Sequence, residues 1–125
     1  MFKYISVIAV LLVLYISTGL AQSEFHGDVY YKNCDCAPEH RVKIWKAGGG
    51  SEDYHRIRCS GDPGYNSGLY TYTTGWYYVG VVGLEGTGCE ESDIKYVYHV
   101  TGVPQQVDLT VYGPQEEPNA PGGGE

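Results

Sequence analysis

The sequence predicts an all-β protein, a small seven-stranded Greek-key β-sandwich with two disulfides. Seven short runs rich in Tyr, Val, Ile and Thr follow one another at fairly even spacing, with Gly and Pro between them. Residues of the first kind favour strands, and Gly and Pro favour turns. No stretch after residue 21 keeps the apolar period of a helix. Seven short strands in roughly ninety residues are typical of a sandwich or a closed barrel.

The first 21 residues have the composition of a secretory signal peptide. Residues 1–4 form a short segment with one positive charge, Lys3, and residues 5–16 form an apolar run. The small residues Gly19 and Ala21 follow, and cleavage is expected after Ala21. The alternative is a membrane anchor, but the apolar run is shorter than the roughly 20 residues that a spanning helix needs. We therefore expect a secreted, extracellular protein with no stable membrane anchor.

Residues 22–112 are expected to form a single β-sandwich domain, and residues 113–125 a disordered tail. The tail, GPQEEPNAPGGGE, is acidic, rich in Pro and Gly, and free of large apolar residues. Apart from Lys3, the chain has seven Lys and Arg against fifteen Asp and Glu, which gives residues 22–125 a net charge of −8. This charge repels phosphate backbones and anionic lipid, so no nucleic-acid partner is expected.

Four cysteines, Cys34, Cys36, Cys59 and Cys89, predict two disulfides in a secreted chain. A bond between Cys34 and Cys36 would close a strained ring, so each is expected to pair with a distant cysteine. Two schemes remain open: Cys34–Cys59 with Cys36–Cys89, or Cys34–Cys89 with Cys36–Cys59. In the chain-entropy model, loops of about 25–55 residues make each bridge worth roughly 3–4 kcal/mol.

Three strands are predicted in the first part of the chain, and the second of them alternates apolar and polar residues, which indicates a half-buried strand. The three strands span Phe25–Asn33, Arg41–Ala47 and Tyr54–Ser60. In the second strand, Val42 and Ile44 share one face, and Trp45 lies on the other face with the charged residues. In the third strand, Ile57 and Cys59 are expected to face inward.

The centre of the sheet is expected to be a β-hairpin over residues 68–83, GLYTYTTGWYYVGVVG. Its strands are the aromatic-rich runs 69–73 and 76–82, joined by Thr74 and Gly75. Residues 84–93 are expected to form an acidic loop with room for one helical turn at 90–93. The last two strands are expected at 94–100 and 105–112, on either side of a turn.

Four sequence runs follow one another in the order found in a group of known secreted domains. They are Val42-Lys-Ile-Trp-Lys46, Gly68-Leu-Tyr-Thr-Tyr, Trp76-Tyr-Tyr-Val-Gly-Val and the Val-Asp-Leu-Thr-Val run that ends at Val111. This order resembles transthyretin-like and Cna-B-like (prealbumin-like) β-sandwich domains over residues 27–112. The resemblance implies a seven- or eight-stranded sandwich, secretion, and a binding or structural role. The Cys34-Asp-Cys36 motif and the tail depart from the family pattern.

The bulk properties of the chain resemble those of a second family. A secreted, acidic, Tyr-rich domain with four cysteines is similar to the microbial guanyl-specific ribonucleases, which implies a hydrolase that uses His and Glu on a phosphodiester. Two histidines would have to converge with a Glu in one groove for such acid–base work. The helix and the catalytic strand motifs of that family are absent here. The candidate histidines are His26, His40, His55 and His99.

No cofactor or metal is expected. The alternative to the disulfides is a zinc cluster, formed by Cys34, Cys36, His40 and Cys59. Its spacing matches no standard zinc motif. Calcium is the alternative for the acidic residues of the 84–93 loop, Glu85, Glu90, Glu91 and Asp93. They lack EF-hand spacing, and a solvated acidic loop is expected instead.

The aromatic side chains are the candidate binding residues, because Tyr and Trp combine a flat apolar ring with a polar group. The candidates are Trp45, Tyr70, Tyr72, Trp76 and Tyr78. On an exposed sheet face such rings suit stacking on sugars or anchoring a protein interface. The alternative is that most of them fill the core or form cross-strand pairs.

We therefore expect a small secreted, non-enzymatic interaction protein, effector-like or an extracellular binding module, with an unknown protein or glycan partner. It would act as a monomer or a weak edge-to-edge dimer. The alternatives are a carbohydrate-binding module and a ribonuclease-like hydrolase. A large exposed apolar patch would favour the first function. Coplanar exposed rings in a row would favour the second, and a groove with two histidines and a Glu would favour the third.

Overall fold

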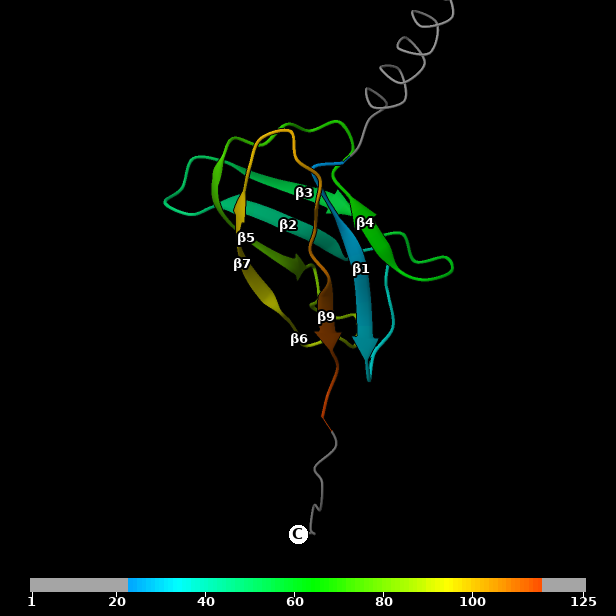
Figure 1. The fold of residues 1–125 in the computed structure, drawn as a ribbon. Helices are drawn as coiled ribbons and strands as arrows, with labels where there is room; N and C mark the ends of the chain where they lie inside the picture. Colours follow the sequence, from blue (N-terminus) through cyan, green and yellow to red (C-terminus); the bar gives the residue numbers. More distant parts are fainter. Residues whose placement is uncertain (1–22, 116–125) are drawn as a thin grey trace, which may run out of the picture.

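The computed structural model describes residues 23–115, which form nine strands and no helix (Figure 1). The expected signal peptide and residues 116–125 of the expected tail lie outside the described residues. Since residues 23–115 contain no helix, that part of the chain has none that could span a membrane. The strands are β1 (Phe25–Lys32), β2 (Arg41–Lys46), β3 (Glu52–Arg56), β4 (Gly64–Asn66), β5 (Gly75–Val82), β6 (Glu91–Ser92), β7 (Ile94–His99), β8 (Gln105–Gln106) and β9 (Leu109–Tyr112).

The strands form two sheets. The first has the order β4-β1-β9-β6, and β8 and β9 run parallel to successive parts of β1. The second has the order β3-β2-β5-β7, and all its neighbours are antiparallel. The chain crosses between the sheets after β1, β3, β4, β5, β6 and β7, so strands that are adjacent in sequence mostly lie in different sheets.

The predicted hairpin at residues 68–83 is wrong. Its second run is strand β5, but residues 69–73 form no strand. Both edges of β5 are already paired, with β2 on one side and β7 on the other, so no edge remains for residues 69–73. That segment instead connects β4 in the first sheet to β5 in the second.

Four further segments differ from the sequence-based expectation, which gave seven strands where the described residues form nine. The third strand ends at Arg56, and Cys59 beyond it is exposed although Ile57 is buried as expected. Residues 64–66 form β4 where only turns were expected, and residues 91–92 form β6 where a helical turn was considered. Residues 105–112 are divided into β8 and β9.

One apolar cluster between the sheets forms the core. Its members come from both sheets because inward positions alternate along each strand. Val42 and Ile44 face inward as the sequence predicts, opposite residues of β1 and β9. The side chain of Phe25 contacts the ring of Tyr77 across the sheets, with ring centroids 5.7 Å apart. The buried residues are Phe25, Val29, Val42, Ile44, Ile57, Tyr65, Tyr72, Tyr77, Val79, Val81, Cys89, Val107, Leu109 and Val111.

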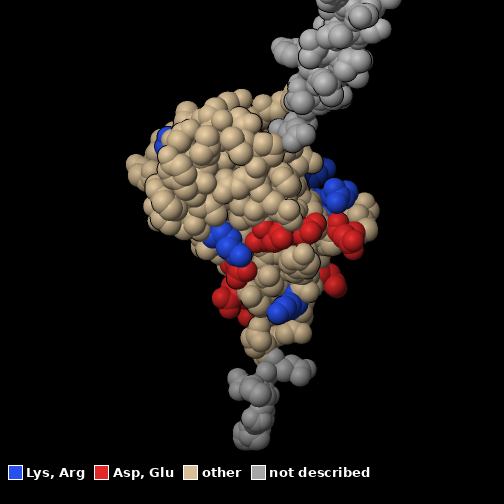
Figure 2. All heavy atoms as spheres, viewed as in Figure 1, with Lys and Arg blue, Asp and Glu red and all other residues tan. Residues whose placement is uncertain are grey.

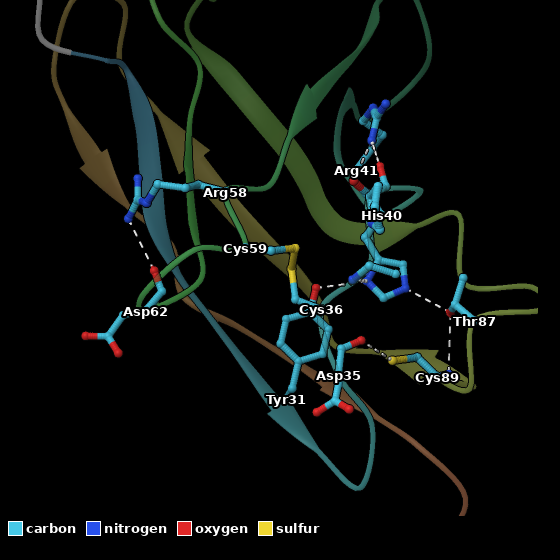
Figure 3. Close-up of a disulfide and its surroundings, with 12 residues drawn as sticks. Tyr31, Asp35, Cys36, His40, Arg41, Arg58, Cys59, Asp62, Thr87 and Cys89 are labelled. Atoms are coloured by element: carbon cyan, nitrogen blue, oxygen red, sulfur yellow. Dashed lines mark hydrogen bonds between the residues drawn. A yellow bond between two sulfur atoms is a disulfide. The ribbon is translucent and has the colours of Figure 1, made fainter.

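Two disulfides, Cys34–Cys89 and Cys36–Cys59, confirm the prediction of two bridges and decide between the two open schemes. Both start in the β1–β2 connection. One joins it to the loop after β5 and the other to the segment between β3 and β4, next to Arg58 and Asp62 (Figure 3). The bridges therefore fasten one crossover between the sheets to two other parts of the chain.

Candidate functional site

The outward side of the β3-β2-β5-β7 sheet carries a group of neighbouring aromatic side chains. Trp45 lies on β2, Trp76 and Tyr78 on β5, and Tyr96 and Tyr98 on β7, all at positions that alternate with core residues. The strand register places Trp45 opposite Tyr78, Tyr78 opposite Tyr96, and Trp76 opposite Tyr98. We call these five residues the aromatic face.

The rings of the aromatic face form a continuous ladder across three strands. Trp45 and Tyr78 stack with centroids 5.3 Å apart, and Tyr78 and Tyr96 lie 4.7 Å apart with planes inclined by 36°. Tyr96 also stacks on Trp76 at 4.8 Å and 15°, and Trp76 contacts Tyr98 at 5.3 Å. The exposed fractions of Trp76, Tyr96 and Tyr98 are 46%, 52% and 50%. Such cross-strand pairs stabilise the sheet and leave a broad aromatic surface in solvent.

Positive charge borders the aromatic face. Lys43 Nζ lies 4.8 Å from the ring centroid of Trp45 and 3.4 Å from Oε1 of Glu52. Arg41 on β2 and Arg56 on β3 occupy the same outward set of positions. With three cations and the one carboxylate of Glu52, the outward side of this sheet has a local charge of +2, although residues 22–125 carry −8.

Three of the five predicted binding residues meet on the aromatic face, namely Trp45, Trp76 and Tyr78. Tyr72 is 3% exposed and packs in the core against Phe25 and Tyr77, so a ligand cannot reach its ring. Tyr70 is 54% exposed but lies away from the face, beside His55. The failed hairpin is the reason, because residues 69–73 do not join the sheet.

Tyr96, Tyr98 and the neighbouring Tyr54 were missed by sequence reasoning. The alternation of residues 94–100 already places Tyr96 and Tyr98 on one side of a strand. Only the pairing of β7 with β5 shows that this side is shared with Trp76 and Tyr78. The alternation in the sequence therefore shows that Tyr96 and Tyr98 share one side of their strand. It does not show which strand lies next to them.

A buried hydrogen-bond network joins two of the four histidines to Glu24. His99 Nε2 donates to Glu24 Oε1 at 2.7 Å, and the Tyr72 backbone N–H donates to the same oxygen at 3.2 Å. The Tyr72 hydroxyl in turn lies 2.7 Å from His55 Nε2. Burial by itself raises the pKa of Glu24, but the hydrogen bonds from His99 and from the backbone at Tyr72 and Gly102 outweigh it, so the pKa lies below 4.5. The network fastens the start of β1 to the second sheet.

His40 is fully buried near the Cys36–Cys59 disulfide (Figure 3). Its Nδ1 accepts hydrogen bonds from the Tyr31 hydroxyl at 2.9 Å and from the Ala37 N–H at 3.3 Å. The proton is therefore on Nε2, which donates to Thr87 Oγ1 at 2.9 Å. Burial lowers the pKa of His40 and outweighs the opposing charge of Glu39. This histidine is a neutral structural group.

The charged side chains are distributed unevenly over the molecule. In the view of Figure 2 they gather in the lower part and along the right side, whereas the upper part carries few. Residues 63–84 contain no Lys, Arg, Asp or Glu, and they include the 67–74 segment that exposes Leu69 and Tyr70. On the face that Figure 2 shows, the upper part of the domain is therefore largely uncharged.

The described part of the chain contains no group of three or more His, Cys, Asp or Glu side chains that could hold a metal ion. The four cysteine sulfurs are bonded in pairs, so the cluster of Cys34, Cys36, His40 and Cys59 has no thiolate to offer zinc.

Comparison with known protein families, with curated proteins and with solved structures gives no significant match for this chain.

Proposed function

We propose that this protein is a small secreted, non-enzymatic interaction protein that binds a partner protein through the aromatic face. The observation that carries the proposal is the ladder of five rings, three of them about half exposed, on one side of one sheet. Contiguous exposed aromatic surface is costly in water and marks interaction sites. Tyr, Trp and Arg are also the residues that dominate protein–protein binding energy. The two disulfides support an oxidising, extracellular location.

The ring geometry favours a protein partner over a flat sugar. Rings that lie in one plane present their faces to a ligand, which is how an aromatic platform holds a pyranose. Here Trp45 stacks on Tyr78 at 24° and Tyr96 on Trp76 at 15°, so neighbouring rings cover part of each other's faces. The ladder presents ring edges and hydroxyl groups instead. Such a surface suits interdigitation with the side chains of a protein.

The local charge defines the partner further. Arg41, Lys43 and Arg56 lie on the same side of the sheet as the aromatic face. An interface is most specific where potentials of opposite sign meet. The partner that fits has an apolar contact surface bordered by Asp and Glu side chains.

The histidine geometry supports a function without catalysis. His40 and His99 are fully buried, and both ring nitrogens of each are hydrogen-bonded. His55 is buried against Tyr72. General acid–base catalysis needs groups that exchange protons with a bound substrate. Of these three histidines, His55 lines the surface hollow between β3 and β4.

The finer fold assignment is also a proposal, namely a Greek-key sandwich of the transthyretin-like kind. The repeated crossing of the chain between two sheets of orders β4-β1-β9-β6 and β3-β2-β5-β7 supports it. A binding or structural role, which the resemblance implies, agrees with the aromatic face.

Affinity capture followed by a measured dissociation constant tests the function. The oxidised protein is used to capture its partner from extracellular fluid, and the captured protein is then purified and titrated. The double variant Trp76→Ser, Tyr96→Ser is expected to bind at least tenfold more weakly, because buried aromatic anchors carry about 2 kcal/mol or more each. Leu69→Ser is the matched control, since Leu69 is 81% exposed on a distant loop.

Equal affinity of the double variant and the wild type would overturn the proposal, as would a loss confined to Leu69→Ser. Size-exclusion chromatography over a range of protein concentrations checks for a second copy on the same face. A dimer that dissociates in the double variant would show that the face pairs with itself, and the proposed foreign partner would then be wrong.

A further inference from the structure

A surface hollow of about 380 Å³ opens between β3 and β4, which are edge strands of different sheets. The end of β3 lies beside β4 in Figure 1, where the chain crosses from one sheet to the other. The walls of the hollow include Tyr54 and Arg56 from β3, Arg58 from the crossover, and Tyr70 from the segment after β4. Small-molecule sites have volumes of about 300–1,000 Å³, so this hollow can hold one sugar ring.

Two arginines give the hollow a positive charge. Arg56 and Arg58 are exposed, and within residues 23–115 neither forms an ion pair. Arg58 instead donates to the backbone carbonyl oxygen of Asp62 at 3.3 Å, which fixes the direction of its guanidinium (Figure 3). The planar guanidinium is suited to hold a carboxylate through two parallel hydrogen bonds. A pair of such groups at one hollow, in an acidic protein, points to an anionic ligand.

Tyr70 gives the hollow an oriented aromatic ring. The edge-on ring of His55 packs against it at 5.0 Å and 86°, and the buried ring of Tyr72 lies 6.4 Å away at 28°. His55 is itself fixed by the Tyr72 hydroxyl. Tyr70 is nevertheless 54% exposed, so one side of its ring is supported and the rest is accessible. An exposed ring held in this way can stack on the apolar face of a pyranose.

We propose that the hollow binds an acidic sugar, with Arg56 and Arg58 on the carboxylate of a uronate unit and Tyr70 stacked on its ring. Each half of this ligand matches one observation, the carboxylate the two arginines and the ring the oriented tyrosine. A bare carboxylate would not use the oriented ring of Tyr70, and a neutral sugar would not use the charge of the two arginines. Arg56 also borders the aromatic face, but Arg58 and Tyr70 belong to the hollow alone, so variants at these two positions test this site independently of the proposed protein partner.

Titration of the oxidised, full-length secreted protein with sugar acids tests this proposal. The probes are trigalacturonate and its neutral counterpart galactotriose, with heteronuclear NMR shifts as the readout. Trigalacturonate is expected to shift the amides of residues 54–58 and 64–70, and galactotriose to bind at least tenfold more weakly. The long-range repulsion between the acidic protein and the probe is screened at 0.15 M salt, where the Debye length is about 8 Å.

Four variants assign the roles. Arg56→Gln and Arg58→Gln are each expected to weaken trigalacturonate binding about tenfold, because each removes a charged hydrogen-bond donor. Tyr70→Ala should have a similar effect, whereas Tyr70→Phe, which keeps the ring, should bind as the wild type does. Lys95→Gln is the charge-matched control, since Lys95 is exposed on β7, at the opposite edge of the β3-β2-β5-β7 sheet.

The competing ligands give outcomes that overturn the proposal. If acetate or sulfate binds as tightly as trigalacturonate, or if Tyr70→Ala binds normally, the hollow is a simple anion site. If a short poly-glutamate peptide binds more tightly than the sugar acid, the ligand is a protein segment. If Lys95→Gln weakens binding as much as Arg58→Gln does, the attraction is a general effect of charge and no site exists.

Discussion

His40 shows how one buried side chain ties the stability of this protein to pH. Its Nδ1 already accepts two hydrogen bonds, from the N–H of Ala37 and the hydroxyl of Tyr31. A proton on Nδ1 would point at these two donors and break both hydrogen bonds. Burial accordingly lowers the pKa of His40 in the folded protein. The unfolded chain takes up this proton near its ordinary pKa of about 6.5. Stability from this residue is therefore present above about pH 6.5 and is lost as pH falls toward the lower folded pKa.

We predict that the wild type loses more stability between pH 7.5 and pH 5.5 than the variant His40→Asn, which cannot be protonated. At pH 7.5 the variant should itself be less stable by about 1–3 kcal/mol, because at least one buried hydrogen-bond partner is left unsatisfied. Urea unfolding at several pH values measures both effects. Parallel pH profiles for the two proteins would contradict the assignment of the proton to His40.

At the scale of the element, strand β5 explains both the core and the aromatic face. Tyr77, Val79 and Val81 point inward, while Trp76 and Tyr78 point outward. The strand is paired along both edges, which places its outward rings between those of β2 and β7. A strand at the edge of the sheet could have only one such neighbour. The ladder of rings is therefore a consequence of the central position of β5.

The turn that ends β5 depends on Gly83. Its φ is +81°, and a Cβ at this position would overlap the backbone carbonyl of Glu39. Gly49, between β2 and β3, has a similar φ of +89° but open space around it. The two glycines thus share a backbone conformation that L-residues disfavour, and they differ only in crowding.

We predict that Gly49→Ala costs about 1–2 kcal/mol, the ordinary penalty for a left-handed residue with a Cβ. Gly83→Ala should cost more, because the carbonyl of Glu39 must move as well. The difference between the urea midpoints of the two variants measures the crowding. Equal losses of stability would show that the β5 turn relaxes freely, and the close approach of Gly83 to Glu39 would then be unimportant.

At the scale of the whole molecule, the two disulfides join connections between strands. They link the β1–β2 connection to the loop after β5 and to the segment between β3 and β4. Cys34–Cys89 closes a separation of 55 residues and Cys36–Cys59 one of 23. Longer closed loops restrict the unfolded chain more. The buried ring of His40, near the Cys36–Cys59 bridge in Figure 3, adds hydrogen bonds to Tyr31 and Thr87, so the β1–β2 connection is held by disulfides and by hydrogen bonds.

We predict that the double variant Cys34→Ala, Cys89→Ala loses about 4 kcal/mol and that Cys36→Ala, Cys59→Ala loses about 3 kcal/mol, from the dependence on loop length. Both variants should remain folded at low temperature, because the apolar core contributes the rest of the free energy of unfolding. Urea unfolding of the two variants under non-reducing conditions gives the comparison. A larger loss from the shorter loop would show that the packing at Cys36 and Cys59 matters more than chain entropy.

The amino-acid pattern by itself determined the all-β class, two bridges and several individual strands. Period-two alternation is a local property, so Val42 and Ile44 were placed inward and Trp45 outward correctly. The four cysteines predicted two bridges but allowed two schemes, because pairing depends on distances across the fold. The same local reasoning placed Trp45 on the outer side of its strand, and it named Trp45, Trp76 and Tyr78 as candidate binding residues.

The tertiary structure alone decided which strands are neighbours, and this determines the candidate sites. Residues 69–73 have as strong a strand composition as β5, yet they pair with nothing because both edges of β5 are occupied. As a result, Tyr72 lies in the core, and Tyr70 lies at the hollow beside Arg56 and Arg58. Tyr96 and Tyr98 joined the aromatic face through the pairing of β7 with β5. Strand composition is local, whereas strand pairing depends on competition between all segments for the same hydrogen-bonding edges.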